Sequence, residues 1–297
     1  MVREVTIHEV GPRDGLQGLP YVLSVDQKRH FIEAIAHSGI KNIEVASFVH
    51  PKLVPTMANA EEVYNEVEYL QYEPYQNMNL STLVMNQRGF DRALESGVEN
   101  FNICFSTSEE FNKRNFGKEQ TEILQEYAQM LQNIPKNQVK VYISCFFGCP
   151  FKGLMSDSTL LTAFQEAAKL GNTIVLCDTT GRAFPLHIKY NLALVATLPE
   201  YKQVSIALHL HEGEKGKEFL FDNIKAAFDF GIRNFDTSIG GIGGCPFMPH
   251  SGGNVPTEDL VEWCEKQNID CGIERKNLDS LINLVKNEFR EKECEIR

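Results

Sequence analysis

Two histidines separated by one residue, His209 and His211, form the sharpest chemical signal in the sequence. They end the apolar run QVSIALHLH, and residues two apart on a β-strand point to the same face. Two imidazoles on one face can hold a single cation, although two core histidines satisfied by hydrogen bonds would look the same. Asp14 offers an oxygen ligand if it lies nearby. Imidazole and oxygen ligands suit Mg²⁺ or Mn²⁺ and are also compatible with Zn²⁺ or Co²⁺.

An arginine and three carboxylates also follow or interrupt apolar runs. Arg13 and Asp14 stand side by side in VGPRDGLQ, directly after the first such run. Glu44 and Asp178 emerge from largely apolar segments, where a carboxylate is costly unless it is paired. Arg13 is the natural partner for both. We expect these carboxylates to orient Arg13 and also to take part in function.

The segment GGIGGCPFMPHSGGN, residues 240–254, is rich in glycine. It is either a flexible turn or a loop that closes over a substrate and needs unusual backbone angles. Cys245 lies inside it. A loop cysteine is usually incidental, but a nearby cation lowers its pKa, and the thiol can then act as an acid or base.

Eight short β-branched or apolar runs must position these residues. They are residues 4–11, 42–48, 78–85, 100–106, 139–147, 172–181, 203–211 and 234–241. Helical patterns lie between them, at 24–39, 121–134, 156–171 and 217–231. This alternation predicts an α/β fold, a (β/α)₈ TIM barrel. A doubly wound open sheet is the alternative, but no G-x-G-x-x-G follows the first run.

Several further expectations follow from a TIM barrel. Chemistry lies at the carboxyl ends of its strands, so Ser47, Thr179 and Asn254 should join the polar residues above on one rim. Glycines before strands should adopt left-handed turns that end the helices; these are Gly39, Gly97, Gly171 and Gly231. We expect the catalytic barrel to occupy residues 1–270. Residues 271–297 would form a helical extension packed on it, with one amphipathic helix at 277–293.

The charge of the chain excludes some partners. Its 297 residues carry a formal net charge of −11, which repels nucleic acids and anionic membranes, so neither is expected as a partner. No apolar run approaches the roughly 18 residues that span a bilayer. The first four residues lack the apolar core of a signal peptide. We interpret the eight cysteines as reduced thiols, which predicts a cytoplasmic protein.

Six segments resemble the 3-hydroxy-3-methylglutaryl-CoA (HMG-CoA) lyase family of metal-dependent barrel enzymes. They are EVGPRDGLQ, IEVASFVHPKLVPTM, SCFFGCPFKG, CDTTG, HLH and GGIGGCPFMPHSGGNVPTEDL, in order from residue 7 to about residue 260. The resemblance implies a lyase that splits HMG-CoA into acetoacetate and acetyl-CoA. It also implies an acyl-CoA substrate, a divalent cation and a homodimer.

The resemblance implies roles for particular residues. The metal ligands would be Asp14, His209, His211 and Asn254. Arg13 would neutralise the thioester oxygen as an enolate forms, and Cys245 would transfer a proton. Glu44 and Asp178 would position Arg13 and the substrate, while Gln17, Ser47 and Thr179 would contact the substrate. Either His209 or Asp178 would be the general base.

The segment HEGEKG, residues 211–216, departs from the family pattern H-D-[TS]-x-G. This departure leaves a related substrate open, such as citramalyl-CoA or a longer-branched glutaryl-CoA. A Claisen-condensing acyltransferase resembling isopropylmalate synthase is a further alternative, but those relatives usually carry a longer chain with a regulatory domain. A barrel that only binds a metabolite would not need a full set of ligands together with Arg13 and Cys245.

Overall fold

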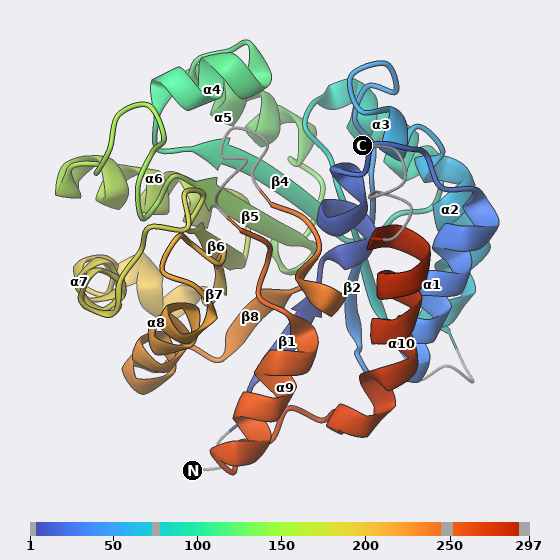
Figure 1. Cartoon of the computed structure of the whole chain (residues 1–297). Helices are drawn as coiled ribbons and strands as arrows, with labels where there is room; N and C mark the ends of the chain where they lie inside the picture. Colours follow the sequence, from blue (N-terminus) through green and yellow to red (C-terminus); the bar gives the residue numbers. More distant parts are fainter. Residues whose placement is uncertain (1–3, 73–77, 245–251, 291–297) are drawn as a thin grey trace.

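The computed structural model describes residues 4–72, 78–244 and 252–290. Within them, parallel strands form one closed barrel in chain order, and β8 pairs with β1 (Figure 1). The strands are β1 (Thr6–Glu9), β2 (Asn42–Ser47), β3 (Asn79–Leu83), β4 (Phe101–Ser106), β5 (Val139–Ser144), β6 (Thr173–Cys177), β7 (Ser205–His209) and β8 (Asn234–Thr237). The predicted TIM barrel is confirmed, with each strand inside its predicted range.

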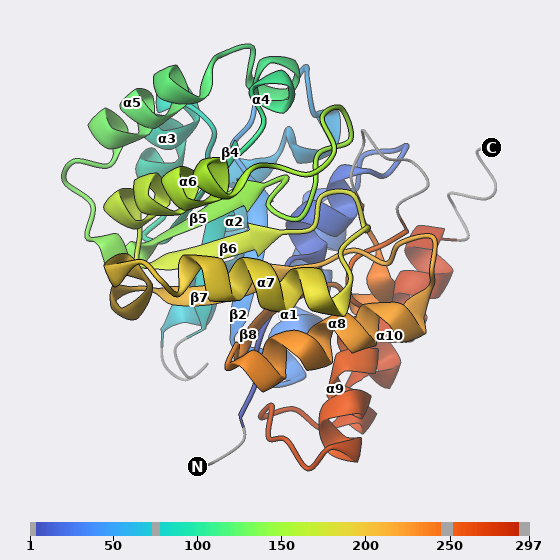
Figure 2. The same ribbon diagram turned by 90° about the vertical axis from the view of Figure 1, so that its left-hand side faces the viewer.

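Helices surround the barrel. They are α1 (Val25–His37), α2 (Ala60–Val67), α3 (Gln87–Glu95), α4 (Glu109–Phe116), α5 (Gln120–Met130), α6 (Asp157–Leu170), α7 (Pro185–Val195), α8 (Lys217–Phe230), α9 (Thr257–Lys266) and α10 (Asp279–Leu284). Figure 2 shows α6 and α7 in front of the strands. In the described residues, no helix is both long and apolar enough to cross a membrane.

Strands β4 to β7 contribute alternate side chains to two different apolar clusters. On β6, Ile174 and Leu176 face outward into the large apolar cluster between strands and helices, whereas Val175 and Cys177 belong to a small cluster inside the barrel. This arrangement explains why the runs read as apolar on both faces. The interior cluster is small, because much of the remaining space inside the barrel is taken by polar side chains.

Three of the four predicted glycine turns have the expected backbone. Gly39, Gly97 and Gly231 have φ values of 101°, 79° and 119°. Gly171 is different, because its φ is −139° and its backbone is extended. A Cβ atom there would lie 2.6 Å from the carbonyl oxygen of Val139, so close approach to the start of β5 is what requires glycine.

The chain after α9 packs along α1 (Figure 1). The single helix predicted at 277–293 is instead a 3₁₀ turn (Arg275–Leu278), α10, and a π-helical segment (Val285–Arg290). The rings of Phe31 and Phe289 meet edge to face, with centroids 5.2 Å apart. The Tyr21 hydroxyl donates to the Phe289 carbonyl oxygen at 2.8 Å. These contacts hold the segment against the start of the barrel.

Candidate active site

Arg13 and Asp14 lie in a single π-helical turn, Gly11–Gly15, directly after β1. The buried Glu9 carboxylate shapes this turn, since it accepts hydrogen bonds from the backbone N–H groups of Gly11 and Ile239. A Cβ on Gly11 would lie 2.5 Å from Glu9 Oε1, and one on Gly15 would lie 2.6 Å from Ile242. Close packing against the loop after β8 therefore requires both glycines and aims Arg13 and Asp14 at the rim.

The Arg13 guanidinium is buried between two carboxylates. Its Nε donates to Glu44 Oε2 at 2.6 Å, and its Nη1 donates to Asp14 Oδ1 at 2.7 Å. Asn102 donates to the other Glu44 oxygen at 2.7 Å. The predicted pairing of Arg13 with Glu44 is observed. These contacts fix the guanidinium in one orientation, which is how a planar arginine gains specificity.

His209 and His211 face each other at the end of β7, with their Nε2 atoms 3.3 Å apart. The Nδ1 of His209 lies 3.2 Å from a carboxylate oxygen of Asp236, and the Nδ1 of His211 lies 2.9 Å from the carbonyl oxygen of Asp178. Both partners are acceptors, so each Nδ1 carries the proton. A protonated His209 can donate from Nε2 to His211 Nε2, and when both rings are neutral the two Nε2 lone pairs face a position that a shared cation can occupy.

Asp14 joins the two histidines in this cluster, and Asn254 lies beside Asp14. Ligand atoms of Asp14, His209 and His211 all lie within 4.8 Å of one another. Asn254 pairs with His211 in an isolated β-bridge, and its amide nitrogen donates to Asp14 Oδ2 at 2.8 Å. Its carbonyl oxygen Oδ1 is buried and has no hydrogen-bond partner in the described part of the chain. Asp14, His209 and His211 therefore offer one oxygen and two nitrogen ligand atoms that fit a divalent cation.

The protonation states of Asp14 and His211 agree with a cation site, whereas at His209 burial is outweighed by Asp236 and Asp14, which raise the pKa of this imidazole. Burial opposes the charge on Asp14, but Arg13 and His209 outweigh it and hold the pKa of this carboxyl below its usual range. Burial and the neighbouring His209 lower the pKa of His211 to about 4. A deprotonated carboxylate and a neutral imidazole are the forms that bind metals.

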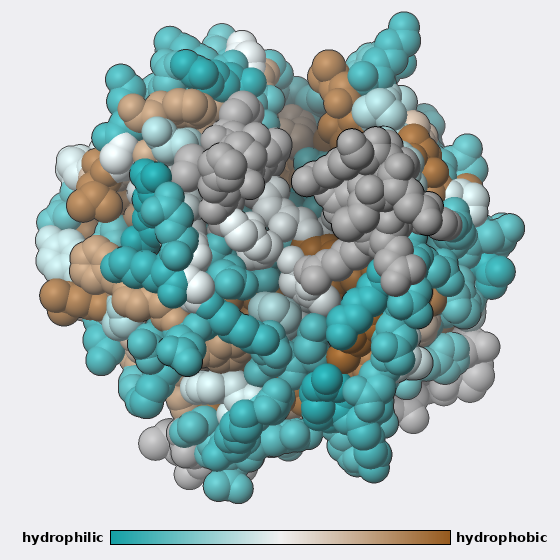
Figure 3. All heavy atoms as spheres, in the orientation of Figure 1, coloured by the Kyte–Doolittle hydropathy of each residue, from teal (hydrophilic) through white to brown (hydrophobic). Residues whose placement is uncertain are grey.

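A cavity of about 540 Å³ opens over this cluster. Figure 3 looks onto the same face as Figure 1, where hydrophobic side chains show in a recess near the centre of a largely hydrophilic surface. Arg13, His209 and Thr179 line the cavity, together with Gln17 and Gly244. A second hollow of about 800 Å³ shares residues with it over the ends of β2 and β3.

Glu44 and Asn254 do not line the cavity but contact Arg13 and Asp14, which do. Asp178 and Ser47 lie apart from it. The Asp178 carboxylate does not pair with Arg13 as expected, because it accepts hydrogen bonds from the backbone N–H groups of Arg182 and Ala183 in its own loop. Ser47 is fully buried, and its hydroxyl has no hydrogen-bond partner among the residues described. Cys245 lies outside the described residues.

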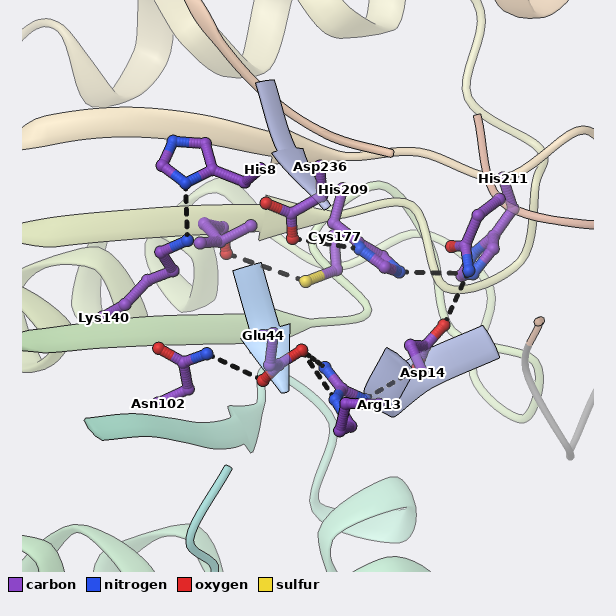
Figure 4. A network of polar contacts seen from close by, with 12 residues as sticks. His8, Arg13, Asp14, Glu44, Asn102, Lys140, Cys177, His209, His211 and Asp236 are labelled. Carbon is purple, nitrogen blue, oxygen red and sulfur yellow. Dashed lines mark hydrogen bonds and ion pairs between the residues drawn. The ribbon is translucent and has the colours of Figure 1, made fainter. Parts of the chain in front are cut away.

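The structure adds residues that sequence reasoning missed. Asp236, Lys140 and Asn102 lie inside the barrel beneath or beside the site (Figure 4). The sequence could have indicated them, because each is a polar residue at an inward position of a strand that should be apolar on both faces. Asn234 and Asp236, two apart in NFD, show the pattern most clearly.

Most of the sequence, residues 4–285, matches the HMGL-like family. The chain belongs to the HMGL-like family. Relatives in this family identify it as a carbon–carbon lyase.

Two curated members show how wide the family is. The hydroxymethylglutaryl-CoA lyase of Bacillus subtilis is 33% identical over 96% of this chain and 92% of its own. The (R)-citramalyl-CoA lyase of Chloroflexus aurantiacus is 35% identical over 91% and 86%. Sequence identity therefore does not decide between HMG-CoA and citramalyl-CoA as the substrate of this chain.

Solved structures of HMGL-like lyases superpose closely on this chain. The B. subtilis HMG-CoA lyase matches with a TM-score of 0.87, at 33% identity over 98% of this chain and 96% of that one. An HMG-CoA lyase from Acinetobacter baumannii, solved with coenzyme A and 3-methylmalate, matches with a TM-score of 0.85, at 30% identity over 98% and 94%.

Proposed function

We propose that this HMGL-like lyase cleaves HMG-CoA into acetoacetate and acetyl-CoA, with a divalent cation held by Asp14, His209, His211 and Asn254. The observation that carries the proposal is the contact between Arg13 and Asp14. It places a fixed guanidinium beside the cation cluster at the rim of one cavity. Mg²⁺ or Mn²⁺ suits this ligand set, and Zn²⁺ or Co²⁺ is also compatible.

The charges around the cavity suit an anionic substrate. Glu44 balances Arg13, and Asp14 offsets half the charge of a divalent cation, so the loaded site keeps one net positive charge. A substrate with one free carboxylate, or one that develops an enolate, supplies the opposite charge. Because this site is shielded from water, such complementarity is stronger than in solution.

The residues of the chain divide the work of a retro-Claisen cleavage. When bound, the cation favours loss of a proton from a hydroxyl group. Arg13 stabilises negative charge on the thioester oxygen as the C–C bond breaks. Cys245 then protonates the acetyl-CoA carbanion. Both nitrogens of His209 are engaged when it binds a cation, so Asp178 is the remaining candidate to accept the hydroxyl proton. Burial raises the pKa of Asp178 to about 6, which suits a general base.

Citramalyl-CoA is a second candidate substrate, because a citramalyl-CoA lyase is at least as similar as the HMG-CoA lyases. It lacks one methylene between the carbinol carbon and the free carboxylate. One methylene is worth about 1–3 kcal/mol, or roughly 10- to 200-fold in kcat/KM.

The homodimer and the cytoplasmic location remain predictions.

The test measures acetoacetate release from HMG-CoA and pyruvate release from citramalyl-CoA, with Mn²⁺ and after EDTA. We expect metal-dependent turnover of one substrate. Arg13→Gln should lower kcat by about 10²- to 10³-fold, since a fixed donor to the developing oxyanion is lost. Cys245→Ala should also lower kcat. Arg275→Gln, a surface arginine paired with Asp279, is the matched control. A folded, metal-loaded protein that cleaves neither thioester would contradict the proposal.

A further inference from the structure

Charged and polar side chains lie beneath the cation cluster, inside the barrel, where the reaction does not reach (Figure 4). Lys140 starts on β5 and extends across the barrel to β1, where its Nζ lies 3.1 Å from His8 Nδ1. His8 and Asp236 are paired positions on the adjacent strands β1 and β8. Because both point into the barrel, Lys140, His8 and Asp236 form one layer below His209.

The buried carboxylate of Asp236 requires a positively charged group nearby. It is 1% exposed, one of its oxygens accepts from His209, and the other has no hydrogen-bond partner among the described residues. His209 cannot supply the balancing charge when it binds a metal, because a metal-bound imidazole is neutral. A buried carboxylate without a nearby cation is strongly unfavourable.

Lys140 is the cation that acts on Asp236 from the other side. His8 and Asp236 are paired positions on β1 and β8, so the Lys140 ammonium that contacts His8 approaches Asp236 from the side away from His209 (Figure 4). Burial and Lys140 lower the pKa of His8 to about 3, so this imidazole is neutral near pH 7. His8 therefore accepts a hydrogen bond from Lys140 without adding a competing charge.

We propose that Lys140, held in place by His8, is a positioning residue for the cation site: its charge balances Asp236, which orients His209 with Nε2 towards the cation. The inference rests on the proposed cation site but not on the proposed substrate. It assigns a task to a lysine that touches neither the metal nor the substrate. Residues that orient histidine ligands typically change metal affinity by 10- to 100-fold when they are lost.

The experiment measures Mn²⁺ binding by titration and the visible absorption of bound Co²⁺ in the full-length chain. Lys140→Met should weaken Mn²⁺ binding by about 10- to 100-fold and change the Co²⁺ spectrum, because His209 is no longer fixed. Lys140→Arg keeps the charge and should retain affinity within a few fold. Lys136→Met is the matched control, since this lysine lies on the surface before β5 and donates only to the Ala168 carbonyl.

The outcomes separate this inference from the proposed reaction. Wild-type protein that binds Mn²⁺ but cleaves no thioester would contradict the reaction and leave the inference standing. A folded Lys140→Met variant with wild-type affinity and spectrum would overturn the inference. If that variant does not fold, His8→Val replaces it, and unchanged Mn²⁺ affinity there would overturn the inference equally.

Discussion

One hydrogen-bond acceptor behind each imidazole decides which nitrogen of His209 and His211 faces the site. The acceptors are the Asp236 carboxylate and the Asp178 carbonyl oxygen. The spacing H-x-H predicts that both rings share a face, and this part of the site could be predicted from the sequence. The tautomers could not, because one acceptor is a main-chain atom of another loop and the other is a carboxylate on the next strand.

A second feature at the residue scale concerns thiol reactivity. A hydrogen bond with Cys264 lowers the pKa of the half-buried Cys271 below its usual value. Burial raises the pKa of Cys104 to about 11 and raises that of Cys177 well above its usual value. Because the thiolate is the nucleophile, Cys271 should react first among the cysteines in the described residues.

Limited alkylation with iodoacetamide at pH 7.5, followed by peptide mass spectrometry, measures this order. Cys271→Ser should remove the fastest phase of alkylation, while Cys104→Ser should leave that phase in place. Faster labelling of Cys104 than of Cys271 in the wild-type chain would show that the hydrogen bond with Cys264 does not form in solution.

At the scale of elements, local patterns predicted the strands because the outward side of each run is apolar and packs against the helices. Some predicted ranges extend past the observed strands. Residues 178–181, for example, form a loop at the rim of the barrel, where the direction of the chain depends on neighbouring loops. The turn at Gly11–Gly15 was missed for the same reason, since Glu9 and the loop after β8 shape it. The tail pattern was amphipathic over 277–293, but packing against α1 divides that segment into shorter pieces.

Helix α3 provides a prediction at this scale. A Cβ atom on Gly89 would lie 2.3 Å from the carbonyl oxygen of Phe48, at the end of β2. Alanine usually stabilises a helix by about 1 kcal/mol relative to glycine, but overpacking here should cost about 1–3 kcal/mol. Gly89→Ala should therefore lower the midpoint of urea unfolding.

The matched control is Gly18→Ala. Gly18 is exposed, and a Cβ there would meet nothing within 4 Å, so its unfolding midpoint should stay close to that of wild type. Equal stability of the two variants would mean that α3 moves away from β2 at little cost. Because Asn86 caps α3 and lines the cavity, such movement would also reach the site.

Across the whole molecule, stability and chemistry belong to opposite faces of the same strands. The large outer core joins strands to helices, which leaves the interior free for charges such as Arg13, Glu44 and Lys140. Strand periodicity predicted the outer core and the rim. It could not predict contacts such as Lys140 with His8, which are 132 residues apart and lie on opposite strands of the closed barrel.

Cation binding should stabilise the whole barrel, because the proposed ligands come from the turn after β1, the end of β7 and the loop after β8. A ligand at 100 times its Kd stabilises a protein by about 2.7 kcal/mol. In a domain somewhat smaller than this one, each kcal/mol raises Tm by about 2–4 °C, so Mn²⁺ should raise Tm by about 5 °C and EDTA should reverse the rise. Asp14→Asn should abolish most of it, whereas Asp229→Asn, a surface carboxylate paired with Lys225, should not. The same rise in both variants would place the stabilising cation somewhere other than at Asp14.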